Sequence, residues 1–125
     1  MLTEKQLTNK ILSNLKSRSD LFLYKRFATG NEAGKPDLTG VYLLPNQGSK
    51  IGLRLEIEVK APRLLTPDLR ALESAPELFF ESSFRLASKR QQYWLRKFKS
   101  YGCLTGVVLD VTHIDLLLSL IESKI

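Results

Sequence analysis

Residues 51–60 read Ile-Gly-Leu-Arg-Leu-Glu-Ile-Glu-Val-Lys, and this stretch decides the fold. Apolar side chains alternate in it with charged ones, which is typical of a β-strand whose successive side chains point to opposite faces. The pattern predicts a strand over 51–60, with Glu56, Glu58 and Lys60 on one face and Leu53, Leu55, Ile57 and Val59 on the other. Taken alone, such a charged face is also compatible with an edge strand exposed to solvent, and that interpretation stays open here.

The residues before this strand predict its partner. Residues 37–44 read as a second strand, and the turn composition of residues 45–49 favours a hairpin between the two strands. Pro36 fixes its own φ and biases Lys35 toward an extended conformation, so Asp37 starts the second strand in a defined direction. If the two strands pair, Asp37 lies near the end of the third strand that carries Glu58 and Lys60.

The rest of the chain supplies helices and two further strands. The predicted elements are a helix after the N-cap Thr3 with Leu7, Ile11 and Leu15 on one side, a strand over 21–27, a glycine-containing loop over 29–35, a helix over 88–100 that stops at Gly102, a strand over 104–111, and a final helix from Thr112. The order α-β-β-β-α-β-α predicts an α/β (α+β) fold with a mixed four-stranded sheet flanked by helices. Residues 61–87 mix prolines with Leu and Phe, which predicts short helical pieces in an insertion.

Composition limits the class of protein. The chain has 125 residues and 14.2 kDa, which predicts a single domain over 1–125. It has one cysteine, so no internal disulfide can form, and no apolar run approaches the roughly 20 residues that span a bilayer. With no leader-like N-terminus, a cytoplasmic protein is expected. The net charge of +6 and pI of about 9.6 favour a polyanionic partner.

Two carboxylates and an amine at the end of a sheet can form a metal site. Carboxylate oxygens from Asp37 and Glu58 suit Mg²⁺ or Mn²⁺, and the backbone carbonyl of Val59 offers a further ligand. A cation held there would polarise a phosphate and lower the pKa of a bound water. Lys60 is placed to orient that water or to neutralise charge on the phosphate.

These residues resemble a known family. Pro36-Asp37, followed by Glu58-Val59-Lys60 on the next strand, resembles the signature of the PD-(D/E)XK nucleases. The surrounding segments 34–38, 55–60, 88–95 and 102–108 look like the VRR-NUC branch of that superfamily. The resemblance implies a restriction-endonuclease-like core and cleavage of DNA that depends on Mg²⁺ or Mn²⁺. It also implies similarity to Holliday-junction resolvases, which often work as homodimers.

The resemblance suggests further site residues. It places Gln91, three residues before Trp94, near the metal-bound water, although Ser88 and Gln91 also match a helix capping box. It places an acidic residue such as Glu4 near a second metal, although a Glu in a first helical turn is favoured by the helix dipole alone. The basic residues expected to contact DNA are Arg26, Lys35, Lys89, Arg90, Arg96 and Lys97. Glu56 is interpreted as a neighbour of the site, and both His113 and Cys103 as structural, Cys103 being buried.

The function expected from the sequence is therefore a metal-dependent DNA endonuclease of bacterial or phage origin, selective for branched or flapped DNA. One alternative keeps the fold as a catalytically inactive nucleic-acid-binding or assembly module. A second alternative is a sequence-specific restriction-type nuclease. A third is a structural protein whose charged strand is merely solvated.

Overall fold

A computed structural model describes residues 1–27, 33–45 and 51–122 of the chain. The major elements are α1 (Glu4–Asn14), β1 (Leu21–Lys25), β2 (Leu38–Leu43), β3 (Gly52–Val59), α2 (Pro67–Ala71), α3 (Pro76–Ser83), α4 (Lys89–Ser100), β4 (Leu104–Val108) and α5 (Thr112–Glu122). The predicted loop over 29–35 and turn over 45–49 lie largely outside the described residues.

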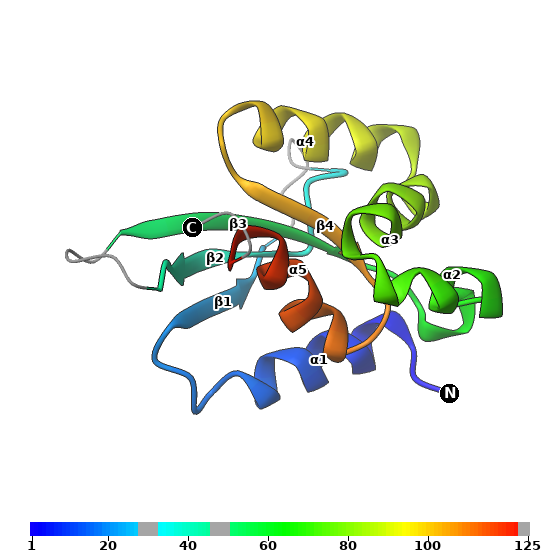
Figure 1. Ribbon diagram of the computed structural model, residues 1–125, viewed down its shortest axis with the longest axis horizontal. Helices are drawn as coiled ribbons and strands as arrows, with labels where there is room; N and C mark the ends of the chain where they lie inside the picture. Colours follow the sequence, from blue (N-terminus) through cyan, green and yellow to red (C-terminus); the bar gives the residue numbers. More distant parts are fainter. Residues whose placement is uncertain (28–32, 46–50, 123–125) are drawn as a thin grey trace.

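The four strands form one mixed sheet in the order β1-β2-β3-β4. The first three strands are antiparallel neighbours, and β4 pairs parallel to β3. A parallel pair needs a long crossover connection, which the helices between β3 and β4 supply. Helices α1 and α5 lie on one side of the sheet and α4 on the other (Figure 1). The predicted α/β class, with a mixed four-stranded sheet flanked by helices, is confirmed.

The apolar side of β3 builds the main core. Leu55, Ile57 and Val59 are fully buried, as the alternation predicted, and they pack with Leu7 and Ile11 of α1 and with residues of α5. Each fully buried aliphatic side chain contributes about 1.5–3 kcal/mol through the hydrophobic effect. The core therefore holds β3 at the centre of the sheet and fixes the direction in which its charged side chains point.

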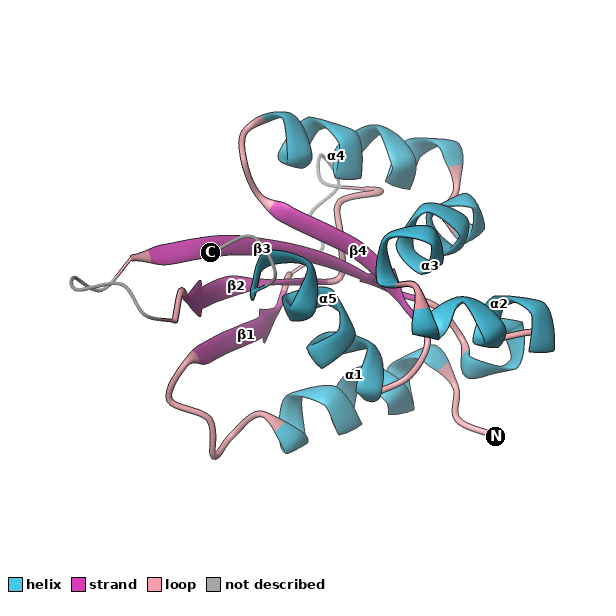
Figure 2. Ribbon diagram, viewed as in Figure 1, coloured by secondary structure: helices cyan, strands magenta, loops and turns pink. Residues whose placement is uncertain are grey.

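The insertion over 61–87 forms short helical pieces, as predicted. Along the chain α2 and α3 come between β3 and α4, and Figure 2 shows them at one end of the sheet. Phe79 and Phe80 of α3 are buried against each other and against the core, with ring centroids 4.9 Å apart. The Ser83 hydroxyl donates a hydrogen bond of 2.9 Å to the Val107 carbonyl. The insertion is thus part of the packed structure and not a free loop.

His113 ties the insertion to the last helix. Its Nδ1 accepts a hydrogen bond of 3.0 Å from the Leu109 N–H, and its Nε2 lies 2.6 Å from Glu73 Oε2. Because Nδ1 accepts, the ring proton sits on Nε2 and is donated to the Glu73 carboxylate. The structural role expected for His113 is confirmed.

Three expectations need correction. The last strand ends at Val108 and not at 111, because the Leu109 amide bonds to His113 and Asp110 begins a turn that its side chain stabilises with Thr112. The first strand ends at Lys25 rather than at 27. Cys103 is only half-buried.

The helix termini follow the sequence signals. Thr3 and Gln6 form a capping box at α1, and Ser88 and Gln91 form another at α4. Gly102 follows α4 with a φ of +91°, a conformation that glycine adopts without strain. Among the described residues, every helix is too short or too polar to traverse a lipid bilayer.

Candidate active site

Asp37 and Glu58 face each other at one end of the sheet. The antiparallel register pairs Leu38 with Ile57, and its continuation by one residue places Asp37 opposite Glu58. The Asp37 carboxylate accepts a hydrogen bond of 3.1 Å from the Val59 N–H. Because the N–H and C=O of one strand residue point to the same edge, the Val59 carbonyl also points toward Asp37. The hairpin predicted from the sequence therefore brings these two acids together.

The segment before Asp37 is fixed from two sides. Gly34 has a φ of +88°, and a Cβ added there would lie 2.6 Å from the Arg90 Cγ, so a larger residue would be strained and would displace the Arg90 side chain. The guanidinium of Arg26 donates through Nε to the Pro36 carbonyl over 3.1 Å. These contacts set the direction in which Asp37 enters β2.

Glu58 is a buried carboxyl whose side-chain oxygens are unequally paired. It is 2% exposed, and Oε2 accepts a hydrogen bond of 3.0 Å from the Gln91 side-chain amide. Oε1 is buried and has no hydrogen-bond partner among the described residues. Burial, and then the neighbouring Asp37 carboxylate, raise the pKa of Glu58 to about 9, a rise that the charge of Lys60 opposes.

Gln91 caps α4, as its capping-box pattern predicted, and its side chain also contacts Glu58. Its side-chain oxygen accepts a hydrogen bond of 2.8 Å from the Ser88 N–H, and its own N–H donates to the Ser88 hydroxyl. The same side chain uses its amide nitrogen to bind Glu58. The start of α4 is therefore capped and connected to the acidic pair by one residue.

Lys60 and Glu4 also lie within electrostatic reach of the pair. Lys60 follows β3 directly, and its N–H donates to the Val108 carbonyl over 2.9 Å. Its ammonium favours the ionised form of Glu58, whereas the charge of Glu4 raises the pKa of Glu58 slightly further. Glu4 is exposed in the first turn of α1 and lines a hollow together with Ala61 and Arg63, which follow β3. The start of α1 therefore lies at the same end of the sheet.

The donor set fits a hard divalent cation that keeps several waters. Two facing carboxylates, one with a buried oxygen that no described residue binds, and a nearby backbone carbonyl are oxygen ligands of the kind that Mg²⁺ and Mn²⁺ accept. No cluster of three or more His, Cys, Asp or Glu side chains suited to a metal occurs in the described part of the chain. The remaining coordination positions would therefore fall to water or substrate.

Glu56 is buried and paired, which overturns the interpretation of a solvated edge strand. β3 lies between two other strands, and Glu56 is completely shielded from solvent. Its carboxylate accepts from Arg54 Nε over 2.9 Å and also binds Arg26 and Thr39. The guanidinium expected to contact phosphate, that of Arg26, is thus engaged with Glu56. The alternation gave no signal for the Thr39 contact, because it depends on which strand lies beside β3.

The remaining basic candidates lie around α4. Lys89, Arg90, Arg96 and Lys97 are all exposed, as expected for residues that contact phosphates. The Arg96 guanidinium lies 4.9 Å from the ring centroid of Phe84, on one side of the helix. On its other side, the ammonium of Lys35 lies 4.8 Å from the Trp94 ring. The structure therefore gathers five of the six basic candidates at one helix.

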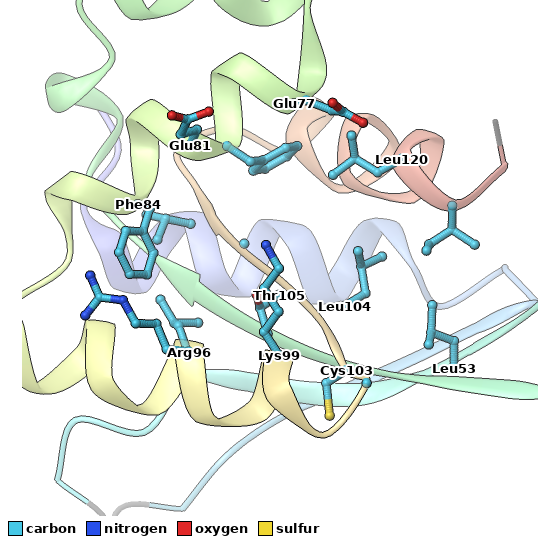
Figure 3. Close-up of a pocket in the computed structure, with 16 residues that line it drawn as sticks. Leu53, Glu77, Glu81, Phe84, Arg96, Lys99, Cys103, Leu104, Thr105 and Leu120 are labelled. Atoms are coloured by element: carbon cyan, nitrogen blue, oxygen red, sulfur yellow. The ribbon is translucent and has the colours of Figure 1, made fainter. Parts of the chain in front are cut away.

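A separate groove of about 680 Å³ follows the free edge of β4, and its lining includes neither Asp37 nor Glu58. Leu104 and Thr105 line its floor, and Phe84 closes one end (Figure 3). Figure 3 shows opposite charges on its two sides, with Arg96 and Lys99 from α4 on one and Glu77 and Glu81 from α3 on the other. Sequence reasoning missed this groove, because it depends on how the insertion packs beside the sheet.

Comparison with known proteins adds no relative. No family model matches the chain, and neither a curated protein nor a solved structure matches it. The functional argument therefore depends on the geometry of the acidic pair and its neighbours.

Proposed function

We propose that the protein is a metal-dependent DNA endonuclease that hydrolyses phosphodiester bonds. The observation that carries this proposal is the meeting of Asp37 and Glu58 across β2 and β3, with a buried Glu58 oxygen that has no partner among the described residues. A buried carboxylate beside another carboxylate is costly unless a cation compensates the charge. The order of these residues and Lys60 also supports the resemblance to the PD-(D/E)XK nucleases and their VRR-NUC branch.

Each side chain has a defined task in this proposal. Asp37, Glu58 and the Val59 carbonyl would hold Mg²⁺ or Mn²⁺, which when bound supplies Lewis-acid polarisation of the phosphate and a water of lowered pKa. Lys60 orients the attacking water or neutralises the charge that grows on the phosphate. Gln91 holds Glu58 in place and offers its amide to the water network, and Glu4 supports that network from α1.

The substrate class follows from the charge around the site. Lys89, Arg90, Arg96 and Lys97 would bind phosphates, and so would Lys35 beside the Pro36-Asp37 segment. A chain of this size has little surface with which to read a base sequence, which favours recognition of branched or flapped DNA by shape. In a bacterial or phage-infected cell, such an enzyme would act in the cytoplasm.

The proposal includes a homodimer, since two active sites would serve the two strands of a branched substrate. The groove along β4 supports it, because a twofold axis parallel to β4 would set the acidic side of each copy against the basic side of the other. In sedimentation analysis, Glu77→Lys with Glu81→Lys should dissociate the dimer. Restoring an opposite charge with Lys99→Glu, which leaves the phosphate-binding residues in place, should recover part of the dimer. A dimer unaffected by either change would exclude this interface.

The test of function is cleavage of branched, flapped, duplex and single-stranded DNA with Mn²⁺ or Mg²⁺. We expect cleavage of branched or flapped DNA, abolished by EDTA and by Lys60→Ala while DNA binding persists. Tight binding of DNA without cleavage of any substrate would favour the inactive binding or assembly module. Discrete products from long linear duplex would favour the restriction-type nuclease.

A further inference from the structure

Part of the sheet face that carries Glu58 is left uncovered by α4. On that face, the register places Phe22 beside Val41 and Tyr24 beside Thr39. Phe22 is 64% exposed and Tyr24 is 51% exposed, and their ring centroids lie 5.5 Å apart. Single exposed apolar residues are ordinary on a protein surface, but neighbouring large ones mark an interaction site.

Aromatic rings continue from this face onto α4. Trp94 and Phe98 have ring centroids 6.0 Å apart, and the exposed ring of Tyr93 lies 5.4 Å from that of Trp94. Phe98 connects the helix with the sheet, because the guanidinium of Arg54 lies 5.2 Å from its ring centroid. Arg54 in turn stands on the open sheet face, where the register places it beside Val41, the neighbour of Phe22.

Cations alternate with these rings. The ammonium of Lys97 lies 5.5 Å from the Trp94 centroid, and that of Lys35 lies 4.8 Å from the same ring. Arg54 has a side chain that is 54% exposed. We use the term aromatic–basic surface for the residues Phe22, Tyr24, Tyr93, Trp94 and Phe98 together with Lys35, Arg54 and Lys97.

The positive charge of the aromatic–basic surface favours a negatively charged partner. The carboxylate that the strand register places within it, Glu56, is fully buried and bound by Arg26 and Arg54, so the exposed charges of its members are positive. An apolar protein partner would cover the exposed Lys97 ammonium and the exposed part of Arg54 without adding an anion, which is costly. In an unpaired nucleic-acid strand, the bases can stack on the aromatic rings and the phosphates can pair with the cations.

We propose that the aromatic–basic surface binds an unpaired DNA strand and leads it to the Asp37–Glu58 site. Arg26 follows β1 directly and donates to the Pro36 carbonyl, so it marks the end of the sheet at which Asp37 lies. Tyr24 and Phe22 precede Arg26 by two and four residues, which is roughly 7 and 13 Å along an extended chain. Bases stack on Tyr24 and Phe22 on the sheet and on Trp94 at the helix, and the phosphates between them meet Arg54, Lys35 and Lys97. The claim that the strand is led to the Asp37–Glu58 site depends on the proposed nuclease function, whereas the claim that the surface binds the strand does not.

Binding is measured with the full-length chain in EDTA, so that no cleavage interferes. The probes are a labelled single-stranded oligothymidylate and a blunt duplex of equal length, followed by fluorescence anisotropy. Phe22→Thr with Tyr24→Thr removes two stacking rings but keeps residues that favour strands. At about 1 kcal/mol or more per stacked base, we expect the single strand to bind about 30-fold or more weakly, with duplex binding changed less than threefold. The matched control is Leu78→Thr on α3, which removes an exposed apolar side chain outside this surface.

A second readout does not require any substitution. Trp94 is the single tryptophan of the chain, so its fluorescence reports on the surface directly. Saturating oligothymidylate should quench the Trp94 emission, while duplex should quench it far less. Unchanged emission, or equal weakening of both probes by the paired substitution, would overturn the proposal. Strand binding without metal-dependent cleavage would refute the nuclease function alone, and cleavage without strand binding would refute this surface alone.

Discussion

Replacing Glu58 by Gln should change how stability depends on pH. In the metal-free protein, burial and the neighbouring Asp37 raise the pKa of Glu58 to about 9, from an ordinary value of 4.5. Between these two values the folded protein keeps the proton that the unfolded chain has lost. The free energy of unfolding therefore falls as pH rises through this window, by about 1.4 kcal/mol per pH unit from this group.

The magnitude can be measured directly by urea denaturation in EDTA. Glu58 is 2% exposed, so solvent screening reduces the effect little. Between pH 6 and pH 8 we expect wild type to lose about 2.7 kcal/mol relative to Glu58→Gln, whose amide does not ionise. Asp68→Asn, which removes an exposed carboxylate on α2, should keep the wild-type dependence.

Addition of Mg²⁺ should reverse the trend in wild type. A cation binds the ionised carboxyl, so its stabilisation grows with pH and reaches about 2.7 kcal/mol at a concentration of one hundred times Kd. Glu58→Gln should lose most of this stabilisation. Parallel pH profiles for wild type and Glu58→Gln would mean that Glu58 is neither desolvated nor close to Asp37, and the proposed metal site would have to be abandoned.

Three further sets of substitutions test the roles of the other candidate residues. Lys60→Ala should lower kcat for DNA cleavage at least about 100-fold with little change in DNA affinity, and loss of folding would contradict its assignment to the site. Gln91→Ala and Ser88→Ala each break the α4 capping box, so each should destabilise the protein by about 1 kcal/mol in urea melts. Only Gln91→Ala should also lower kcat, because of these two residues only Gln91 binds Glu58. Replacing Lys89 and Arg96 by Ala should weaken binding of all DNA sequences and reduce the salt slope of log K by about 2, and a sequence-dependent loss would indicate base contacts instead.

Sequence alone predicted the fold class because its strongest patterns are local. The alternation in residues 51–60 and the capping signals at Thr3 and Ser88 depend on neighbours two to four residues away. The hairpin that brings Asp37 to Glu58 followed from two such strands and one turn. These local features do not depend on the tertiary structure that forms around them.

The contacts around Glu56 could not be predicted in the same way. The charge of Glu56 suggested a face exposed to solvent, but β3 lies between two other strands of the sheet. Arg26 and Thr39, which are distant in the sequence, bind the Glu56 carboxylate. The end of β4 at Val108 likewise depends on His113, whose ring takes the Leu109 amide away from the sheet. Such partners are distant in sequence and leave no periodic signal.

Anomalous diffraction from a crystal soaked in Mn²⁺ tests the central proposal most directly. We expect one strong peak between the carboxylates of Asp37 and Glu58, within ligand distance of both and beside the Val59 carbonyl. A peak held by other residues, or an empty acidic pair in crystals of protein that cleaves DNA with Mn²⁺, would contradict it.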